Sequence, residues 1–266
     1  MRRRSASKGA GGALLAAVVV GAVSLSGTAA VAQDKKPLVP GTFSGNVALT
    51  SEYLYRGISQ TDDQPAIQGG FNYELEIAKP VSVYAGVWGS NVDFSGTESD
   101  ATHGASIEMD WTGGFRGTFG SSGVTYDVGF IYYSYPGADS SYNYNFWEAQ
   151  TAIGYDFGVA AVTGSINYSP DFFGSSGTAW YPKLAVSVPI PSVDGLSLSA
   201  YVAKQYVQDE ATYGIDKDYV EWNLTVSYNV LDWFDASIAY EDTNLDPGTN
   251  NDGQTAAVLF TISKSF

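Results

Sequence analysis

Apolar and polar residues alternate along most of the chain from Thr42 to Phe266. Alternation with period two is the pattern of a β-strand whose two faces meet different surroundings. In the second such segment, Ile67 and Phe71 fall on one face and Glu74 falls on the other. We predict twelve strands, at residues 42–55, 66–78, 81–91, 105–116, 124–134, 145–157, 159–168, 179–188, 196–207, 220–230, 234–241 and 255–266.

The connections between these strands alternate in length. Short connections fall at residues 79–80, 117–123, 158, 189–195 and 232–233, and long ones at 56–65, 92–104, 135–144, 169–178, 208–219 and 242–254. A meander with short turns at one end and long loops at the other is typical of an outer-membrane barrel. We predict an all-β fold over residues 42–266, a transmembrane antiparallel up-and-down β-barrel of about 12 strands, with both termini in the periplasm.

The N-terminus has the three parts of a secretory signal. Basic residues at positions 2–4 precede an apolar stretch that is densest from Ala13 to Leu25, and Ala30-Val31-Ala32 closes the segment. An uncleaved anchor helix would need about 20 apolar residues, which this stretch does not reach. We predict a signal peptide over residues 1–32, cleaved after Ala32, and a short periplasmic lead over residues 33–41.

Composition narrows the function classes. The chain holds 28 acidic and 13 basic residues, a formal charge of −15, and removal of residues 1–32 makes the charge −19. Nucleic-acid binding is excluded because phosphate contacts need a basic face. Cysteine is absent, so disulfides and thiolate sites are excluded as well. The mean hydropathy of −0.07 fits a barrel, where only every second residue meets lipid.

The alternative fold is a soluble β-sandwich or a lipocalin-like barrel, whose strands also alternate. The regular alternation of loop lengths favours the membrane barrel. So does a final strand that ends in Phe266, which resembles the signature by which outer-membrane barrels are recognised for assembly. Aromatic residues near strand ends on the apolar face form the expected interfacial girdle: Tyr53, Tyr55, Trp111, Phe115, Trp147, Phe157, Trp222 and Phe234.

Several runs resemble a known family. They are residues 51–61 (SEYLYRGISQT), 83–94 (VYAGVWGSNVDF), 132–137 (YYSYPG) and 168–174 (YSPDFFG). These runs are similar to those of the TorF porin family, and the likeness extends over residues 43–266. The resemblance implies an outer-membrane β-barrel with a porin function, and it implies no particular substrate.

Twelve strands lie between the eight whose side chains fill a lumen and the sixteen that leave a wide channel, so we expect a narrow pore. The long connections, of about ten residues, are expected to be too short for a deep plug. The alternation predicts nine acidic and three basic pore-lining residues: Glu52, Arg56, Glu148, Lys183, Glu221 and Glu241 near the outer mouth, Glu108 midway, and Glu74, Glu76, Asp110, Arg116 and Asp127 towards the periplasm.

Rings of acidic side chains favour cations, which predicts a mild cation preference. The alternative is that these charges only pair with one another and hydrate the wall. Asp110, Arg116 and Asp127 would be one such cluster.

Two functions stay open: a porin for small hydrophilic solutes or ions, and a structural or adhesion-type barrel with an occluded lumen. An enzyme is not predicted, because His103 lies in a loop without the Ser motif of outer-membrane phospholipases. Residues 242–253 begin like a calcium loop but place Pro247 and Gly253 where Gly and Glu are required. We expect no metal and no cofactor. Expected partners are outer-membrane lipids and lipopolysaccharide, the barrel-assembly machinery of a Gram-negative cell and small solutes, with the oligomeric state open.

Overall fold

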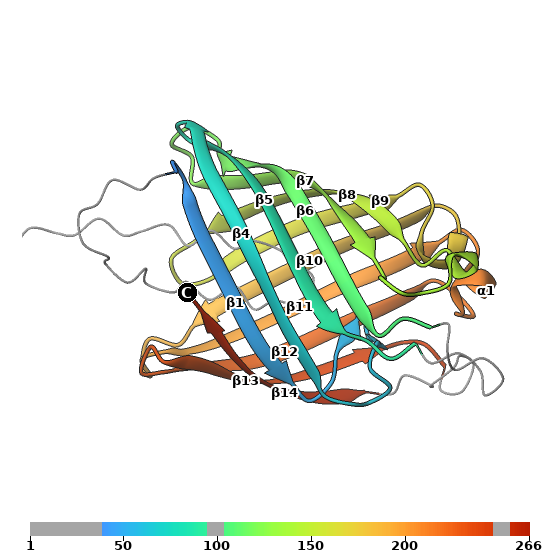
Figure 1. Cartoon of the computed structure of the whole chain (residues 1–266). Helices are drawn as coiled ribbons and strands as arrows, with labels where there is room; N and C mark the ends of the chain where they lie inside the picture. The colour runs from blue at the N-terminus through green and yellow to red at the C-terminus, as the bar shows by residue number, and fades with distance from the viewer. Residues whose placement is uncertain (1–38, 95–103, 247–255) are drawn as a thin grey trace, which may run out of the picture.

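The computed structural model describes residues 39–94, 104–246 and 256–266. Twelve strands form one closed antiparallel barrel in which consecutive wall strands are hydrogen-bonded neighbours, and β1 closes the ring between β4 and β14 (Figure 1). The wall strands are β1 (Thr42–Thr50), β4 (Ala66–Ala78), β5 (Val81–Asn91), β6 (Ile107–Thr118), β7 (Val124–Ser134), β8 (Phe146–Asp156), β9 (Ala161–Ser169), β10 (Ala179–Pro189), β11 (Leu196–Val207), β12 (Tyr219–Val230), β13 (Phe234–Thr243) and β14 (Ala257–Ser265). The predicted twelve-stranded barrel is confirmed.

The two ends of the barrel differ as the loop lengths predict. Short turns join β4 to β5, β6 to β7, β8 to β9, β10 to β11 and β12 to β13 at the end where β1 begins and β14 ends. The longer connections lie at the other end, which also carries the short helix α1 (Glu210–Tyr213) (Figure 1). We call these the short-turn end and the long-loop end. No helix in the described ranges is long and apolar enough to cross a membrane.

The outward face of the wall is apolar and exposed. Phe43, Ile67 and Trp111 are 69%, 66% and 47% exposed, as period-two alternation requires of residues that face away from the lumen. Of the eight aromatic residues assigned to the girdle, Tyr53 and Tyr55 do not lie on this face. They are only 2% and 5% exposed, because both turn into the barrel.

The reason is that β1 ends at Thr50, five residues before its predicted end. The hydroxyl of Thr50 donates to the carbonyl of Glu52 at 2.9 Å, and the chain then folds inward. Strands β2 (Leu54–Tyr55) and β3 (Ile58–Ser59) pair with each other in a separate small sheet. We call residues 51–65 the inward segment. The long connections are expected to be too short for a deep plug, but one of them, the inward segment, nevertheless turns into the long-loop half of the lumen.

The turn of the inward segment depends on Gly57. Arg56 and Gly57 have φ values of 52° and 77°, a left-handed conformation that favours glycine. A Cβ atom on Gly57 would lie 2.3 Å from the Cγ2 of Thr243, so the segment approaches β13 closely at this point. This contact fixes one side of the hairpin against the wall.

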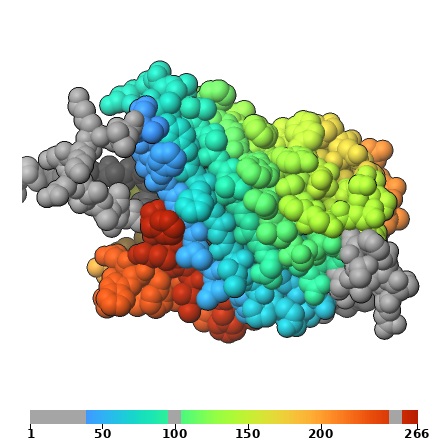
Figure 2. All heavy atoms as spheres, in the orientation of Figure 1, coloured from blue at the N-terminus to red at the C-terminus, as the bar shows by residue number. Residues whose placement is uncertain are grey.

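The barrel closes where the first and last strands meet. The amide of Gly45 donates to the carbonyl of Phe266 at 2.9 Å, and the amide of Phe266 donates back at 3.0 Å. The ring of Phe266 meets Phe71 edge-on with centroids 6.4 Å apart. Figure 2 shows the C-terminal residues in red directly beside β1 in blue.

Candidate functional site: the constricted lumen

The long-loop half of the lumen is filled with side chains. Inward-facing residues on eleven of the wall strands are each less than one tenth exposed there: Thr50, Gln68, Trp88, Glu108, Tyr133, Glu148, Asn167, Tyr181, Gln205, Glu221 and Glu241. We call this level the constriction. Its side chains are shielded from solvent in this conformation, because the inward segment packs among them.

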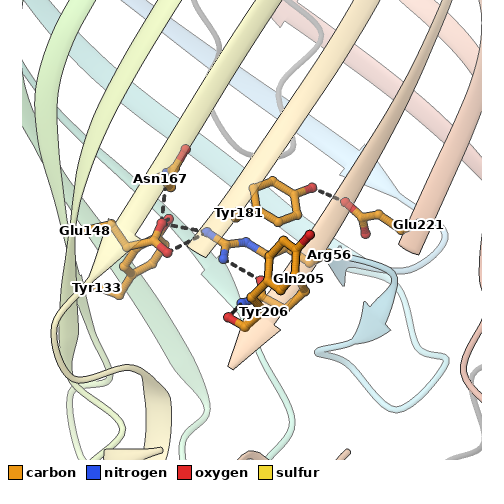
Figure 3. Close-up of polar contacts among 8 residues, drawn as sticks. All are labelled: Arg56, Tyr133, Glu148, Asn167, Tyr181, Gln205, Tyr206 and Glu221. Carbon is orange, nitrogen blue, oxygen red and sulfur yellow. Dashed lines mark hydrogen bonds and ion pairs between the residues drawn. The ribbon is translucent and has the colours of Figure 1, made fainter. Parts of the chain in front are cut away.

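Arg56 anchors the inward segment to the opposite wall (Figure 3). Its Nη2 donates to both carboxylate oxygens of Glu148 on β8, at 2.7 and 2.6 Å, and its Nη1 donates to Oε1 of Gln205 on β11 at 2.6 Å. The guanidinium also lies 4.0 Å from the ring centroid of Tyr181. The hydroxyl of Tyr219 donates to the Arg56 carbonyl at 2.9 Å.

The ion pair between Arg56 and Glu148 is buried and extensively hydrogen-bonded. Glu148 also accepts from the hydroxyl of Tyr133 at 3.2 Å and from the side-chain amide of Asn167 at 2.9 Å. Burial alone would lower the pKa of the Arg56 guanidinium, but the charge of Glu148 together with the nearby Tyr55, Tyr133 and Tyr181 raises the pKa above its usual range. The arginine is therefore fully charged, and Glu148 serves as its anchor.

A second contact joins the inward segment to β5 and β6. The hydroxyl of Tyr53 donates to Oε1 of Glu108 at 3.1 Å, and its ring meets Trp88 edge-on at 5.5 Å. Glu108 was expected midway along the lumen and Asp110 towards the periplasm, and both placements are wrong. Strand β6 begins at Ile107 at the long-loop end, so Glu108 and Asp110 both lie in the constriction, 0% and 5% exposed.

The remaining charges of the constriction gather on β10 to β13. The hydroxyl of Tyr181 donates to Glu221 (Figure 3), and the amide of Asn223 donates to Glu241 at 3.0 Å. The ammonium of Lys183 lies 5.0 Å from the ring centroid of Tyr201. Glu52, which follows β1, is half-buried. The constriction thus holds six acidic residues (Glu52, Glu108, Asp110, Glu148, Glu221 and Glu241) and two basic ones (Arg56 and Lys183).

A separate cluster lines the short-turn half of the lumen. Arg116 contacts Asp127 at 3.5 Å and Glu74 at 3.8 Å, and its guanidinium lies 3.8 Å from the ring centroid of Tyr84. The hydroxyl of Tyr84 donates to Asp127 at 2.7 Å. The expected cluster therefore forms around Arg116, with Glu74 in the place proposed for Asp110. Glu76 is exposed further along β4.

The uncharged polar and aromatic residues that hold the inward segment are not among the pore-lining residues predicted from the sequence. The strand register turns three of them, Tyr133, Tyr181 and Tyr219, towards the lumen. Their even or odd positions within the alternating strands could have indicated this. Within the inward segment, the run Tyr53-Leu54-Tyr55-Arg56-Gly57 could have indicated a turn that carries a single charge. His103 and the calcium-like run beyond Asp246 lie outside the described residues. Within those residues, no group of three or more His, Cys, Asp or Glu could hold a metal ion.

Comparison with solved structures gives the same fold. The COG4313 outer membrane channel from Pseudomonas putida F1 is 10% identical, with a TM-score of 0.54 over 89% of this chain and 100% of that one. The KdgM porin is 9% identical, with a TM-score of 0.51 over 84% of this chain and 99% of that one. The NanC porin is 8% identical, with a TM-score of 0.51 over 84% of this chain and 98% of that one.

At these identities the likeness concerns the fold of the barrel. No curated protein matches the chain. A family profile matches residues 34–266, which is nearly the whole length beyond the predicted signal peptide. The chain belongs to the family described as bacterial protein of unknown function (Gcw_chp).

Proposed function

We propose that this protein is an outer-membrane porin that passes small hydrophilic solutes or ions with a mild preference for cations. The observation that carries the proposal is a closed wall that is apolar outside and charged inside. Closure leaves no open sheet edge in the wall, which a hydrocarbon surrounding requires. A charged interior lowers the entry barrier for ions. The known channels that share the fold agree with this assignment by analogy.

The cation preference follows from the charge balance of the constriction. Arg56 neutralises Glu148, which leaves Lys183 against the other acidic residues there. At an effective dielectric constant of 20, a cation about 8 Å from one carboxylate gains roughly 2 kcal/mol before its desolvation is subtracted. Several carboxylates around one path therefore outweigh one ammonium.

The test is the reversal potential of the purified protein in a planar bilayer under a KCl gradient. The wild-type channel should favour K⁺, and changing Glu52, Glu221 and Glu241 to Gln should move the reversal potential towards zero. Glu148 is kept because its loss would release Arg56. The shift should shrink at high salt, because salt screens the carboxylates.

A control variant changes three exposed acidic residues outside the lumen to Asn, namely Asp171, Asp194 and Asp232. This variant should keep the wild-type reversal potential. An anion-selective wild type, or a lumen variant that behaves like the wild type, would contradict the cation preference.

The burial of the constriction supports a second candidate, a structural or adhesion-type barrel with an occluded lumen. In the proposed porin, the conformation described here is a closed state, and the inward segment must leave the lumen before solutes pass. Conductance separates the two candidates. If neither the wild type nor a variant with Arg56 changed to Met conducts in a bilayer, the occluded barrel is the better proposal.

The location and maturation of the protein belong to the same proposal. We place it in the cell outer membrane after removal of residues 1–32, in contact with lipopolysaccharide and assembled by the barrel-assembly machinery. N-terminal sequencing should find Gln33 first, and the mature protein should partition with the outer membrane. The resemblance of four sequence runs to the TorF porin family adds to the porin assignment.

A further inference from the structure

Glu108 and Asp110 are two residues apart on β6, so both side chains point into the lumen. Their carboxyl groups interact directly with each other. Glu108 is 0% exposed and Asp110 is 5% exposed, which places two acidic groups side by side away from water. An uncompensated buried charge is strongly unfavourable, and two adjacent like charges increase that cost.

The surrounding protein does not supply the missing positive charge. Oε2 of Glu108 and Oδ1 of Asp110 are buried and have no hydrogen-bond partner. The hydroxyl of Tyr53 donates to Oε1 of Glu108 at 3.1 Å, and the hydroxyl of Tyr135 also bonds Glu108, but neither phenol carries a positive charge. Across the described part of the chain, no Lys or Arg nitrogen lies within 4.0 Å of either carboxylate, and Arg56 is bonded to Glu148.

Aromatic rings complete the surroundings of the pair. Trp88 on β5 and Tyr133 on β7 are the register partners of Asp110, one on each side. Tyr53 covers the pair from the inward segment and contacts the ring of Trp88. Two carboxylate oxygens, a phenol oxygen and aromatic faces are groups that attract a cation with a single charge.

We propose that Glu108 and Asp110 bind one alkali cation, K⁺ or Na⁺, beneath Tyr53. A divalent ion fits less well, because Ca²⁺ and Mg²⁺ take about six or more oxygen ligands and the described residues offer no third acidic or histidine ligand here. The bound cation neutralises the pair and keeps Glu108 ionised to accept from Tyr53. It thereby holds the inward segment in the lumen. The inference rests on the proposed channel for its role in permeation, but the site itself is tested without conduction.

The first measurement is the unfolding temperature of the folded barrel in detergent at pH 8. KCl, NaCl and N-methyl-D-glucamine chloride are compared at equal ionic strength. The wild type should unfold several degrees higher in K⁺ or Na⁺ than in the large organic cation. The double change Glu108→Gln and Asp110→Asn should abolish this difference.

The matched control is the double change Glu74→Gln and Glu76→Gln, an equally spaced acidic pair on β4 that faces the short-turn half of the lumen. It should keep the full alkali-cation effect. If the wild type shows no difference between the salts, or the control loses it, the proposal is overturned. A wild type that is instead stabilised only by acid would mean that the pair shares a proton.

A second measurement does not depend on the variants folding. Crystals of the wild type soaked in Rb⁺ should give an anomalous peak between the carboxylates of Glu108 and Asp110. Absence of that peak at saturating Rb⁺ would overturn the proposal. A peak in a protein that never conducts would support the cation site and contradict the porin function. The failure of one proposal is therefore distinguishable from the failure of the other.

Discussion

Arg56 shows how one residue changes role between the sequence pattern and the fold. Alternation assigns it to the pore wall, yet it lies on the inward segment and reaches across the lumen to Glu148 and Gln205. Burying an ion pair costs desolvation, and the pair is favourable only when further hydrogen bonds satisfy it. Tyr133 and Asn167 supply those bonds to Glu148. The charge of Arg56 therefore positions the segment and is not free to select ions.

The ion pair leads to a prediction about the inward segment. Changing Glu148 to Gln should destabilise the inward position by about 3 kcal/mol, a roughly hundred-fold rise in the open population. Arg56 is the only trypsin site in residues 51–65, and it is 3% exposed when the segment is inside. The rate of tryptic cleavage after Arg56, followed by mass spectrometry, should rise accordingly.

A matched control for this variant is Glu74→Gln, which removes a carboxylate that contacts Arg116 at the other end of the lumen. Cleavage after Arg56 should stay slow in that variant. Equal cleavage of wild type and Glu148→Gln would mean that the ion pair does not hold the segment.

The pKa of Glu52 predicts how pH changes the stability of the inward position of the same segment. Burial raises its pKa from 4.5, a hydrogen bond from Ser59 partly opposes this, and the charges of Asp63 and Glu241 add to the rise. The inward position therefore binds its proton more tightly than the open one. Its stabilisation by Glu52 is complete below about pH 4.5 and is lost as the pH rises through the raised pKa.

The expected result is that wild-type channels in a planar bilayer spend more time closed at pH 5 than at pH 8. Glu52→Gln cannot titrate and should reduce this difference. A wild type that closes more at pH 8 would contradict the stabilisation of the inward position by protonated Glu52.

At the scale of the strands, small residues make room for inward aromatic ones. Gly114 on β6 and Gly129 on β7 are register partners, and the phenol of Tyr84 lies over both. A Cβ atom on Gly129 would lie 2.5 Å from the Tyr84 hydroxyl oxygen. These two glycines therefore let Tyr84 lie against the wall and reach Asp127.

Replacing Gly129 by Ala should push Tyr84 off the wall and lower the stability of the barrel by about 1–3 kcal/mol, as overpacking does. The midpoint of urea unfolding in detergent micelles measures this loss. Gly164→Ala on β9 is the matched control, because a Cβ atom there meets nothing within 4 Å. Equal midpoints for the two variants would contradict the packing argument.

The pattern of alternation predicted the wall better than the lumen. The bounds of β4, β5, β7 and β11 agree with the predicted ranges, because each alternates up to a clear break. Residues 51–55 also alternate, with Tyr53 and Tyr55 in phase with β1. Alternation with period two indicates that the two faces of a strand differ. It does not show whether the apolar face contacts lipid or the aromatic interior of the lumen. The burial of these tyrosines could therefore not be predicted from alternation alone.

At the scale of the whole molecule, Phe266 joins the two ends of the barrel wall. Phe266 exchanges two backbone hydrogen bonds with Gly45, and its ring packs over the Gly45 backbone and against Phe71. Deleting Phe266 should lower the amount of folded barrel in the outer membrane, measured as heat-modifiable protein on a gel. Phe119→Asp, in a short turn at the same end, changes a comparably exposed ring and should fold normally. Normal folding after the deletion would contradict a role of Phe266 in assembly.

The closure between β1 and β14 also sets when folding can finish. Thr50 and Thr261 share a hydrogen bond across 211 positions, so the pairing that completes the ring joins the two ends of the chain. Contacts of such high sequence separation form slowly, since the intervening chain must first be organised. Until β14 arrives, β1 and β13 each present an unpaired edge that could pair with another chain. A chain interrupted during synthesis before Ala257 should therefore aggregate or be degraded, rather than persist as a smaller barrel.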